Sequence, residues 1–166
     1  MDYIHSCRSP LGRITLAACE GALIGLWFEG QRYYASSLDR DCREAGLPVF
    51  REAERWLDCY FSGEIPGFTP PLAPRGTDYR KAVWDTLLTI PYGDTAAYGE
   101  VAVRTAARLG LSRGSARAAG AAVGRNPISL IIPCHRVIGA GGQLTGYAGS
   151  LDRKAYLLDL ERRHGR

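Results

Sequence analysis

The sequence predicts an α+β protein with two domains, a small N-terminal α/β domain over residues 1–64 and a mostly helical domain over residues 77–166. Three observations predict this order. The first part contains short β-prone runs followed by a helical pattern. In the last part, apolar residues recur at the spacing of amphipathic helices. Between the two, residues 65–76 carry four prolines and two glycines, which is typical of an extended inter-domain linker.

A β-hairpin is expected near the start of the first domain. Residues 14–18 and 23–28 are short β-prone runs, and they flank Glu20-Gly21, which suits a turn. A helix is expected over residues 50–61, where apolar side chains recur at helical spacing, and Gly63 follows as a stop signal.

The second domain is predicted to begin and end with a helix. Thr77 or Asp78 can cap the first helix, and residues 151–163 form an amphipathic last helix that packs back on the core. Between them, residues 128–132 are entirely apolar and too few for a helix, so we expect an extended, buried segment. That segment leads directly to Cys134.

Two short helices joined by a turn are predicted in the middle of this domain. Asp94 or Thr95 can cap the first, which stops near Gly110. Residues 112–115 restart the chain into a basic second helix over residues 116–123. Such a pair has the pattern of a helix-turn-helix in a winged-helix-like domain, although two packed helices of an ordinary core give the same pattern.

Composition and charge narrow the function classes. The chain is 46% hydrophobic and 23% charged, as in globular proteins, and no apolar run is long enough to span a membrane. Residues 1–6 lack a signal pattern, so we expect a cytoplasmic monomer without a membrane partner. The net charge is −3 over residues 1–78 but +5 over residues 95–150, which contain six arginines and a single acidic residue, Glu100. This asymmetry favours a polyanionic partner, although basic stretches are often simply solvated surface.

The five cysteines are scattered, odd in number and without a CxxC pair, which indicates free thiols in a reducing compartment. A zinc site built from His5, Cys7 and Cys19 is conceivable, but the spacing matches no metal motif. Scattered cysteines are more often small buried hydrophobes. We therefore predict no metal.

Cys134 is the candidate nucleophile. A thiol attacks only as the thiolate, and apolar burial alone would raise its pKa. His135 can take the proton directly or through a water molecule, and Glu161 on the last helix can orient the imidazole. Because neighbouring residues of an extended strand point to opposite faces, His135 is expected to reach back over a turn or to act through water.

A longer motif around Cys134 is much more specific than the Cys-His pair. It consists of Asn126-Pro127, five residues, Pro133-Cys134-His135-Arg136-Val137, and later Gly146-Tyr147-Ala148-Gly149. This motif resembles the O6-alkylguanine-DNA alkyltransferase family. The likeness is strong over residues 77–161, where it includes residues 92–102 and 116–118, and Lys154. In the first half of the chain the resemblance is weaker and depends on residues 9–12 and the hairpin that follows them.

The resemblance implies a role for each motif position. Cys134 would accept the alkyl group, while His135, a bridging water and Glu161 keep it a thiolate. Asn126 would brace the turn that connects the helix-turn-helix to the cysteine.

Further positions would bind the substrate. Tyr98 would donate a hydrogen bond to N3 of the target guanine, and Arg117 would fill the space that the flipped nucleotide leaves. The backbone of Cys134 and Val137 would read the guanine amino group. The pocket wall would be formed by Tyr147, Ala148 and Gly149. Arg125 and Arg136 are further expected DNA contacts.

The implied reaction is a direct displacement at the alkyl carbon, with sulfur attacking and guanine leaving. It needs no cofactor, and because a thioether has no easy route back to a thiol, each molecule would act once. The expected partner is double-stranded DNA that contains O6-alkylguanine, with O4-alkylthymine as a second candidate lesion and the second helix approaching the minor groove. The base must be flipped out because O6 is out of reach inside a duplex.

The sequence departs from the family at three places. Ile24 stands where zinc-binding relatives would have a histidine ligand, so Cys19 alone does not predict zinc. Ser150 replaces a second glycine and would either narrow the pocket or cap the last helix. The loop over residues 108–115 is longer than in close relatives, without a functional explanation from sequence.

Two other functions are compatible with parts of the pattern. A non-catalytic helix-turn-helix protein could bind DNA as a sensor, but relatives of that type lack the cysteine. A small thiol enzyme acting on a soluble substrate would turn over many times and would not need DNA.

Overall fold

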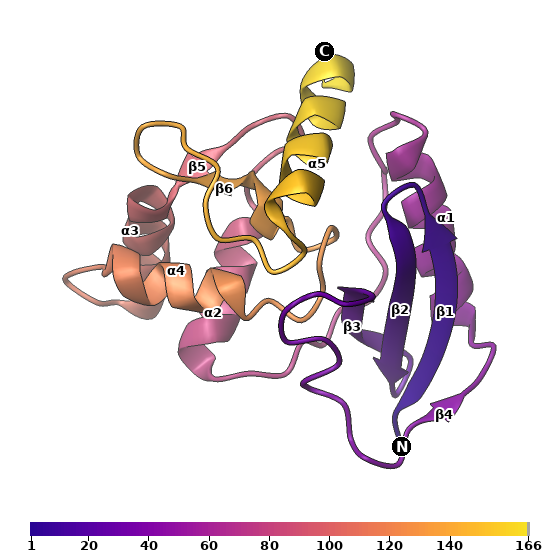
Figure 1. The fold of residues 1–166 in the computed structure, drawn as a ribbon. Helices are drawn as coiled ribbons and strands as arrows, with labels where there is room; N and C mark the ends of the chain where they lie inside the picture. Colours follow the sequence, from indigo (N-terminus) through magenta and orange to yellow (C-terminus); the bar gives the residue numbers. More distant parts are fainter. Residues whose placement is uncertain (166) are drawn as a thin grey trace. The chain divides into compact units, whose positions relative to one another are not determined.

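The computed structural model describes residues 1–165, and the chain divides into two compact units. The first unit comprises residues 1–75 together with residues 127–129, and the second contains residues 76–126 and the chain from Leu130 onward. A sheet-containing unit is followed by a mostly helical one, which confirms the predicted α+β class (Figure 1).

A four-stranded sheet and one helix form the first unit. The strands are β1 (Tyr3–Ser9), β2 (Gly12–Cys19), β3 (Ala22–Phe28) and β4 (Arg43–Glu44), in the order β3-β2-β1-β4, and the helix is α1 (Pro48–Phe61). The predicted hairpin is confirmed, since β2 and β3 pair antiparallel and Cys19 faces Ala22 across the Glu20-Gly21 turn. Strands β1 and β4 were not expected from the sequence.

Segments from elsewhere in the chain cover the free edge of β3. The backbone N–H of Leu23 donates to Pro71 O at 2.8 Å, and that of Ala73 donates to Leu23 O at 2.7 Å. The N–H of Leu26 likewise donates to Pro127 O at 2.9 Å. Residues 65–75, predicted as a linker, therefore belong to the first unit, because their backbone satisfies an edge strand that would otherwise be open.

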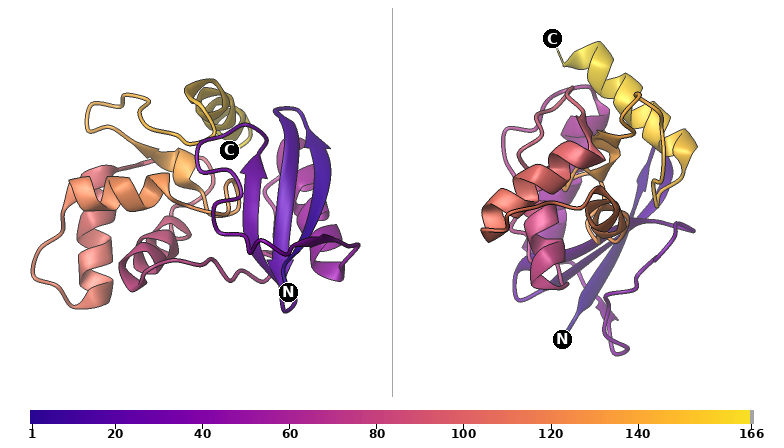
Figure 2. Two further views of the ribbon diagram at one scale, coloured as in Figure 1. Left: turned by 60° about the horizontal axis from the view of Figure 1, so that its bottom comes forward. Right: turned by 90° about the vertical axis from the view of Figure 1, so that its left-hand side faces the viewer.

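The second unit contains six elements followed by a last helix (Figures 1 and 2). These are α2 (Asp78–Leu87), β5 (Ala96–Ala97), α3 (Tyr98–Leu109), α4 (Ala116–Gly124), the 3₁₀ helix η1 (Cys134–Arg136) with β6 (Val137–Ile138), and α5 (Leu151–His164). Helix α2 is capped by Thr77, whose hydroxyl accepts from the Arg80 N–H at 3.2 Å.

The start of α3 differs from the prediction. Its N-cap is Ala97 rather than Asp94 or Thr95, because Ala96 and Ala97 are drawn into parallel pairing with Val137 and Ile138. Alanine has no side-chain acceptor, and Glu100 compensates by accepting a hydrogen bond from the Ala97 N–H at 3.3 Å. Tyr98 is thereby fixed at the junction of β5 and α3.

Helices α3 and α4 pack against each other and are joined by residues 110–115. Gly110 ends α3 in the left-handed region at φ 68°. Ser115 caps α4 by accepting from the Ala118 N–H at 3.1 Å. A Cβ at position 114 would lie 2.5 Å from the carbonyl oxygen of Ala102, so only glycine allows the loop to lie this close to α3.

Residues 128–132 are buried, as predicted, but they are not an extended strand. Leu130 has φ 70°, and the chain turns through residues 129–131. Cys134 then begins a 3₁₀ turn instead of continuing a strand. The apolar composition reflects burial alone and carries no information about the turn. Within residues 1–165, no helix combines the length and the apolar character needed to cross a membrane.

Candidate active site around Cys134

The backbone at Cys134 is held by Asn126, the residue that follows the C-cap of α4. The side-chain Nδ2 of Asn126 and the backbone N–H of Cys134 both donate to the carbonyl oxygen of Ile132, each at 2.8 Å. Asn126 is itself buried. It therefore ties the end of α4 to the turn that presents the cysteine, which is the bracing role expected for it.

The thiol of Cys134 is almost enclosed, with 5% of the residue exposed. Burial raises its pKa to about 11, although the side chain of Asn126 and the charge of Lys154 both act to lower it. Burial thus works against the thiolate expected from the sequence. Its polar neighbours nevertheless favour the anion.

His135, Arg136 and Glu161 form a buried cluster. His135 Nε2 donates to Glu161 Oε2 at 2.6 Å, and Arg136 Nε donates to Glu161 Oε1 at 2.8 Å. Arg136 Nη2 adds a bond of 3.1 Å to Oε2, and the N–H of Gly93 adds one of 3.0 Å to Oε1. The structure thus brings together the His135–Glu161 pair that the sequence separates by 26 positions.

These contacts determine the protonation states of the cluster. Burial raises the pKa of the Glu161 carboxyl, but hydrogen bonds and charge from His135 and Arg136 outweigh it and bring the pKa to about 2. Burial lowers the pKa of His135, against the opposing effect of Glu161. A neutral imidazole facing an ionised carboxylate must carry its proton on Nε2, so its lone pair is on Nδ1.

Arg136 does not make the DNA contact predicted from the sequence. It is 8% exposed, and besides Glu161 its guanidinium binds the carbonyl oxygen of Ile90 through Nη1 at 2.8 Å. The guanidinium carbon Cζ of Arg136 lies 5.7 Å from the centroid of the Tyr92 ring. A side chain used in this way orients Glu161 and cannot also reach a phosphate, which corrects the prediction.

Lys154 has a place in the site that sequence reasoning did not assign. Its side chain is fully buried, and Nζ donates to Val137 O at 2.5 Å and to Thr145 O at 2.7 Å. No carboxylate is among these partners, and the Cys134 sulfur lies close enough for the two charges to interact. Burying an ammonium group with only two carbonyl partners costs desolvation free energy, which suggests a functional reason for its position. Lys154 is recognised as a site residue by this burial, which the sequence alone does not reveal.

Tyr98 is linked to Lys154 through the glycine-rich loop. The hydroxyl of Tyr98 donates to the same Thr145 carbonyl oxygen that Lys154 binds, at 3.3 Å. Tyr98 is half-buried at the start of α3. The Thr145 carbonyl oxygen thus joins Tyr98 to Lys154, which in turn binds the backbone of Val137.

The predicted pocket wall, Tyr147 to Gly149, leads into α5. Tyr147 and Gly149 are buried and Ala148 is half-buried. Ser150 caps α5 by accepting from the Arg153 N–H at 3.4 Å, while its own φ is 94°. The structure therefore assigns Ser150 a capping role in a backbone conformation that suits glycine better.

Arg117 and Arg125 lie at the two ends of α4 and are both exposed. Between them the helix presents mainly alanine and glycine. Small side chains of this kind allow a helix to approach a groove closely, and the exposed guanidinium groups can reach phosphates or bases.

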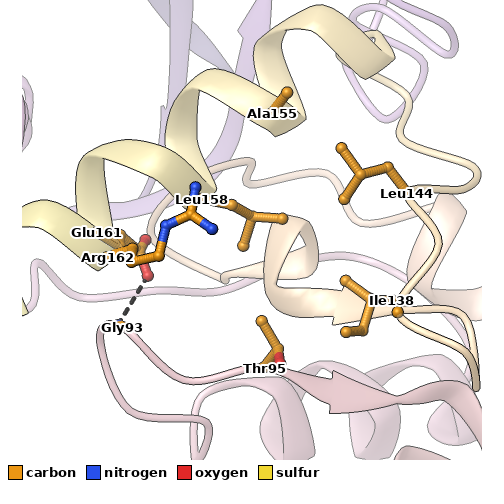
Figure 3. Close-up of a pocket in the computed structure, with 9 residues that line it drawn as sticks. Gly93, Thr95, Ile138, Leu144, Ala155, Leu158, Glu161 and Arg162 are labelled. Atoms are coloured by element: carbon orange, nitrogen blue, oxygen red, sulfur yellow. Dashed lines mark hydrogen bonds between the residues drawn. The ribbon is translucent and has the colours of Figure 1, made fainter.

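A cavity of about 400 Å³ lies on another side of the second unit. Figure 3 shows Ile138, Leu144 and Leu158 around it, with Glu161 and Arg162 at one end. Glu161 and its backbone partner Gly93 lie both in its lining and in the contacts described above, whereas Cys134 and Tyr98 are not in the lining. This cavity is not the one in which a base would meet the thiol. No three His, Cys, Asp or Glu side chains gather as a metal site among residues 1–165.

Both units match known families. A family model described as the DNA binding domain of 6-O-methylguanine DNA methyltransferase matches residues 78–163, and one described as its ribonuclease-like domain matches residues 3–74. A methylated-DNA–protein-cysteine methyltransferase of Methanosarcina acetivorans is 54% identical over 160 residues, which are 96% of this chain and 97% of the relative. One from Mycobacterium leprae is 46% identical over 165 residues, covering 98% of this chain and 93% of the relative.

Solved structures give the same result. The crystal structure of Mycobacterium tuberculosis OGT in complex with DNA superposes with a TM-score of 0.83 at 42% identity, covering 98% of this chain and 94% of that one.

Proposed function

The chain belongs to the 6-O-methylguanine DNA methyltransferase family, and from this premise we propose that it repairs O6-alkylguanine in double-stranded DNA by moving the alkyl group to its own Cys134. One observation carries the assignment of the acceptor. Cys134 is the cysteine whose sulfur has an amide donor, Asn126, and a buried cation, Lys154, as neighbours, and it adjoins the His135–Glu161 pair.

The reaction is a displacement at carbon. A lone pair of the Cys134 sulfur forms the S–C bond while the C–O6 bond breaks, and its electrons stay on guanine. The thiol loses one proton, and the departing guanine gains one at N1. A stable thioether remains, so each chain reacts once, and the chemistry requires no cofactor.

The thiol proton leaves through His135. Glu161 holds the proton of the imidazole on Nε2, so Nδ1 is the atom that accepts, directly or through a water molecule. The role of Glu161 is to fix this tautomer, and Arg136 and Gly93 hold Glu161 in turn. As the proton departs, the Lys154 ammonium and the Asn126 amide stabilise the developing thiolate.

The leaving base is received by Tyr98 and the loop that Lys154 holds. Tyr98 transfers its hydrogen bond from Thr145 O to N3 of the guanine, while Lys154 keeps Thr145 and Val137 in place. The Val137 and Cys134 backbone reads the amino group, and Tyr147, Ala148 and Gly149 border the base.

The duplex is bound through α4. The small residues of this helix enter the minor groove, Arg117 fills the space of the flipped nucleotide, and Arg125 contacts the backbone. The reaction needs a free thiol and a DNA substrate, so we place the protein in the cytoplasm, where thiols stay reduced.

Intact mass measurement after incubation with an oligonucleotide duplex containing O6-methylguanine tests the proposal. One methylene is expected per chain, located at Cys134, and absent from Cys134→Ala. Cys7→Ala is the matched control and should gain the methylene normally, because Cys7 has a similarly raised pKa but no role in transfer. Continued turnover, or DNA binding without an adduct, would contradict the proposal.

The finger role of Arg117 has its own test. Arg117→Ala should slow transfer from duplex DNA by about tenfold or more, since the few kcal/mol of base flipping are no longer offset. Transfer from the free base, which leaves no gap to fill, should be much less affected. Equal losses on the two substrates would remove Arg117 from this role.

A further inference from the structure

We propose that the connection between α3 and α4 is a second DNA contact, in which Arg108, in the last turn of α3, and Arg113, in the loop, bind phosphates of the duplex beside the groove that α4 enters. This inference rests on the proposed function. It explains the long loop that the sequence leaves without a role, and it adds a sequence-independent part to the binding energy.

The loop is a defined structure that projects from the two helices. It leaves α3 at Gly110, and Figure 1 and the left view of Figure 2 show it swinging outward before it enters α4. Gly114 holds it against Ala102, and Ser115 caps the next helix. Anchors at both ends keep Arg113 in one region, so little ordering entropy remains to be lost on binding.

The positive charges in and beside this loop are uncompensated, with Arg108 in the last turn of α3, Arg113 in the loop and Arg117 in the first turn of α4. Arg108, Arg113 and Arg117 are all exposed, and no carboxylate among residues 1–165 lies within ion-pair distance of any of them. Arg104, one turn earlier on α3, is instead paired with Glu100 at 3.7 Å. Positive charge thus increases along the motif toward the loop and the first turn of α4, where the backbone N–H groups add to the positive potential.

Phosphate is the group that fits this surface best. Guanidinium groups bind phosphate through two parallel hydrogen bonds, and the same helix pair carries Arg117. The loop also exposes Leu111, at 53%, which an apolar protein partner could use. We favour DNA because the arginines flank the helix that receives the duplex, and a protein partner is an outcome of the test.

The salt dependence of binding measures these contacts. In a Cys134→Ala background, which prevents reaction, binding to an undamaged duplex is followed across a KCl series. Each lost phosphate contact should reduce the slope of log K against log[KCl] by about 0.9. Raising KCl from about 50 to about 200 mM should therefore weaken the binding of Arg113→Gln by a factor about threefold smaller than for the parent. For the double variant Arg108→Gln, Arg113→Gln this factor should be about tenfold smaller.

Two variants serve as controls. Arg113→Lys keeps the charge and should keep the slope, which separates charge from loop structure. Arg163→Gln removes an equal charge from α5, where Arg163 pairs with Asp159 at 3.0 Å, and should leave the slope unchanged. Because phosphate contacts carry no sequence information, binding to damaged and undamaged duplexes should weaken equally.

The outcomes separate this inference from the proposed function. An unchanged slope in Arg113→Gln, or the same change in Arg163→Gln, overturns the loop contact even if the parent protein with Cys134 accepts the methyl group. Conversely, absence of the methylene adduct refutes the proposed function whatever the slopes are. Equal unfolding midpoints of the variants confirm that a lost slope reflects lost contacts.

Discussion

Cys7 and Cys134, one in each unit, have the same pKa in opposite surroundings. Burial raises the pKa of both thiols to about 11. Around Cys7 the carboxylates of Glu54 and Asp58 disfavour the thiolate further. Around Cys134 the Asn126 amide and the Lys154 ammonium favour it.

The value of the pKa therefore does not identify the nucleophile, but the sign of the neighbouring charges does. The same holds for the two buried carboxyls. Asp2 has a pKa of about 2 and binds Arg75 through both oxygens, at 2.7 and 2.8 Å, in the unit without the proposed acceptor. Glu161 has a pKa of about 2 beside His135. A perturbed carboxyl becomes a functional candidate only when a nucleophile and a base accompany it.

The largest effect is expected when the surroundings of Cys134 lose their positive charge. Lys154→Gln keeps a donor near Val137 and Thr145 but removes the cation, and should slow transfer by about 100-fold from duplex and free base alike. Single-turnover kinetics measure the rate. The exposed Lys81→Gln is the matched control, and a Lys154→Gln rate within twofold of wild type would contradict the electrostatic role.

Acid should remove the stabilisation that Glu161 provides. Its folded pKa lies below the ordinary value, so its contribution is complete above about pH 4.5 and is lost as the pH falls toward about 2. At about 1.4 kcal/mol per pKa unit, this amounts to roughly 3 kcal/mol. Urea unfolding at a series of pH values should show a flatter profile for Glu161→Gln, which is also less stable at pH 7.

Asp85→Asn, on the exposed side of α2, is the matched control for the loss of one carboxylate. Asp2→Asn should flatten the acid limb as well, without affecting alkyl transfer. If Asp2→Asn slowed transfer as much as Glu161→Gln does, the distinction between the two carboxyls would fail.

Tyr98→Phe should slow transfer by about tenfold, because one hydrogen bond to the leaving base, worth about 1.4 kcal/mol, is lost in the transition state. The loss should appear on duplex and free base equally, which distinguishes Tyr98 from Arg117. Tyr156→Phe, on the exposed face of α5, is the matched control. An unchanged rate in Tyr98→Phe would remove Tyr98 from the reaction.

The smallest effect is expected at Ser150. Ser150→Gly relieves the backbone at φ 94°, worth about 1 kcal/mol, and loses only a few tenths of a kcal/mol as a cap, so it should be slightly more stable. Ser150→Ala loses the cap and keeps the strain, and should be less stable than Ser150→Gly by about 1–2 kcal/mol. Thermal unfolding measures both, and equal stabilities would show that the backbone is not strained.

Several local features of the fold could be predicted because short-range rules determine them. The Glu20-Gly21 turn and the Thr77 cap depend on residues a few positions apart. The apolar pattern of α5 was misjudged, because Leu151 and Ala155 are exposed while Leu157 and Leu160 are buried. Strand β1 escaped prediction because its pairing with β2 and β4 comes from the sheet, and its own burial alternates only partly. The start of α3 was misplaced for the same reason, since pairing with Val137 and Ile138 overrides the caps at Asp94 and Thr95.

The sequence by itself determined which family this chain belongs to and which cysteine is the proposed acceptor, because the Pro-Cys-His-Arg motif and its flanks are contiguous. Only the tertiary structure decided what surrounds the sulfur. It buried Arg136 on Glu161, brought Lys154 to Val137 and Thr145, and enclosed the Cys134 thiol. The reason is physical: desolvation and hydrogen bonding depend on distances in space between residues that the sequence keeps far apart.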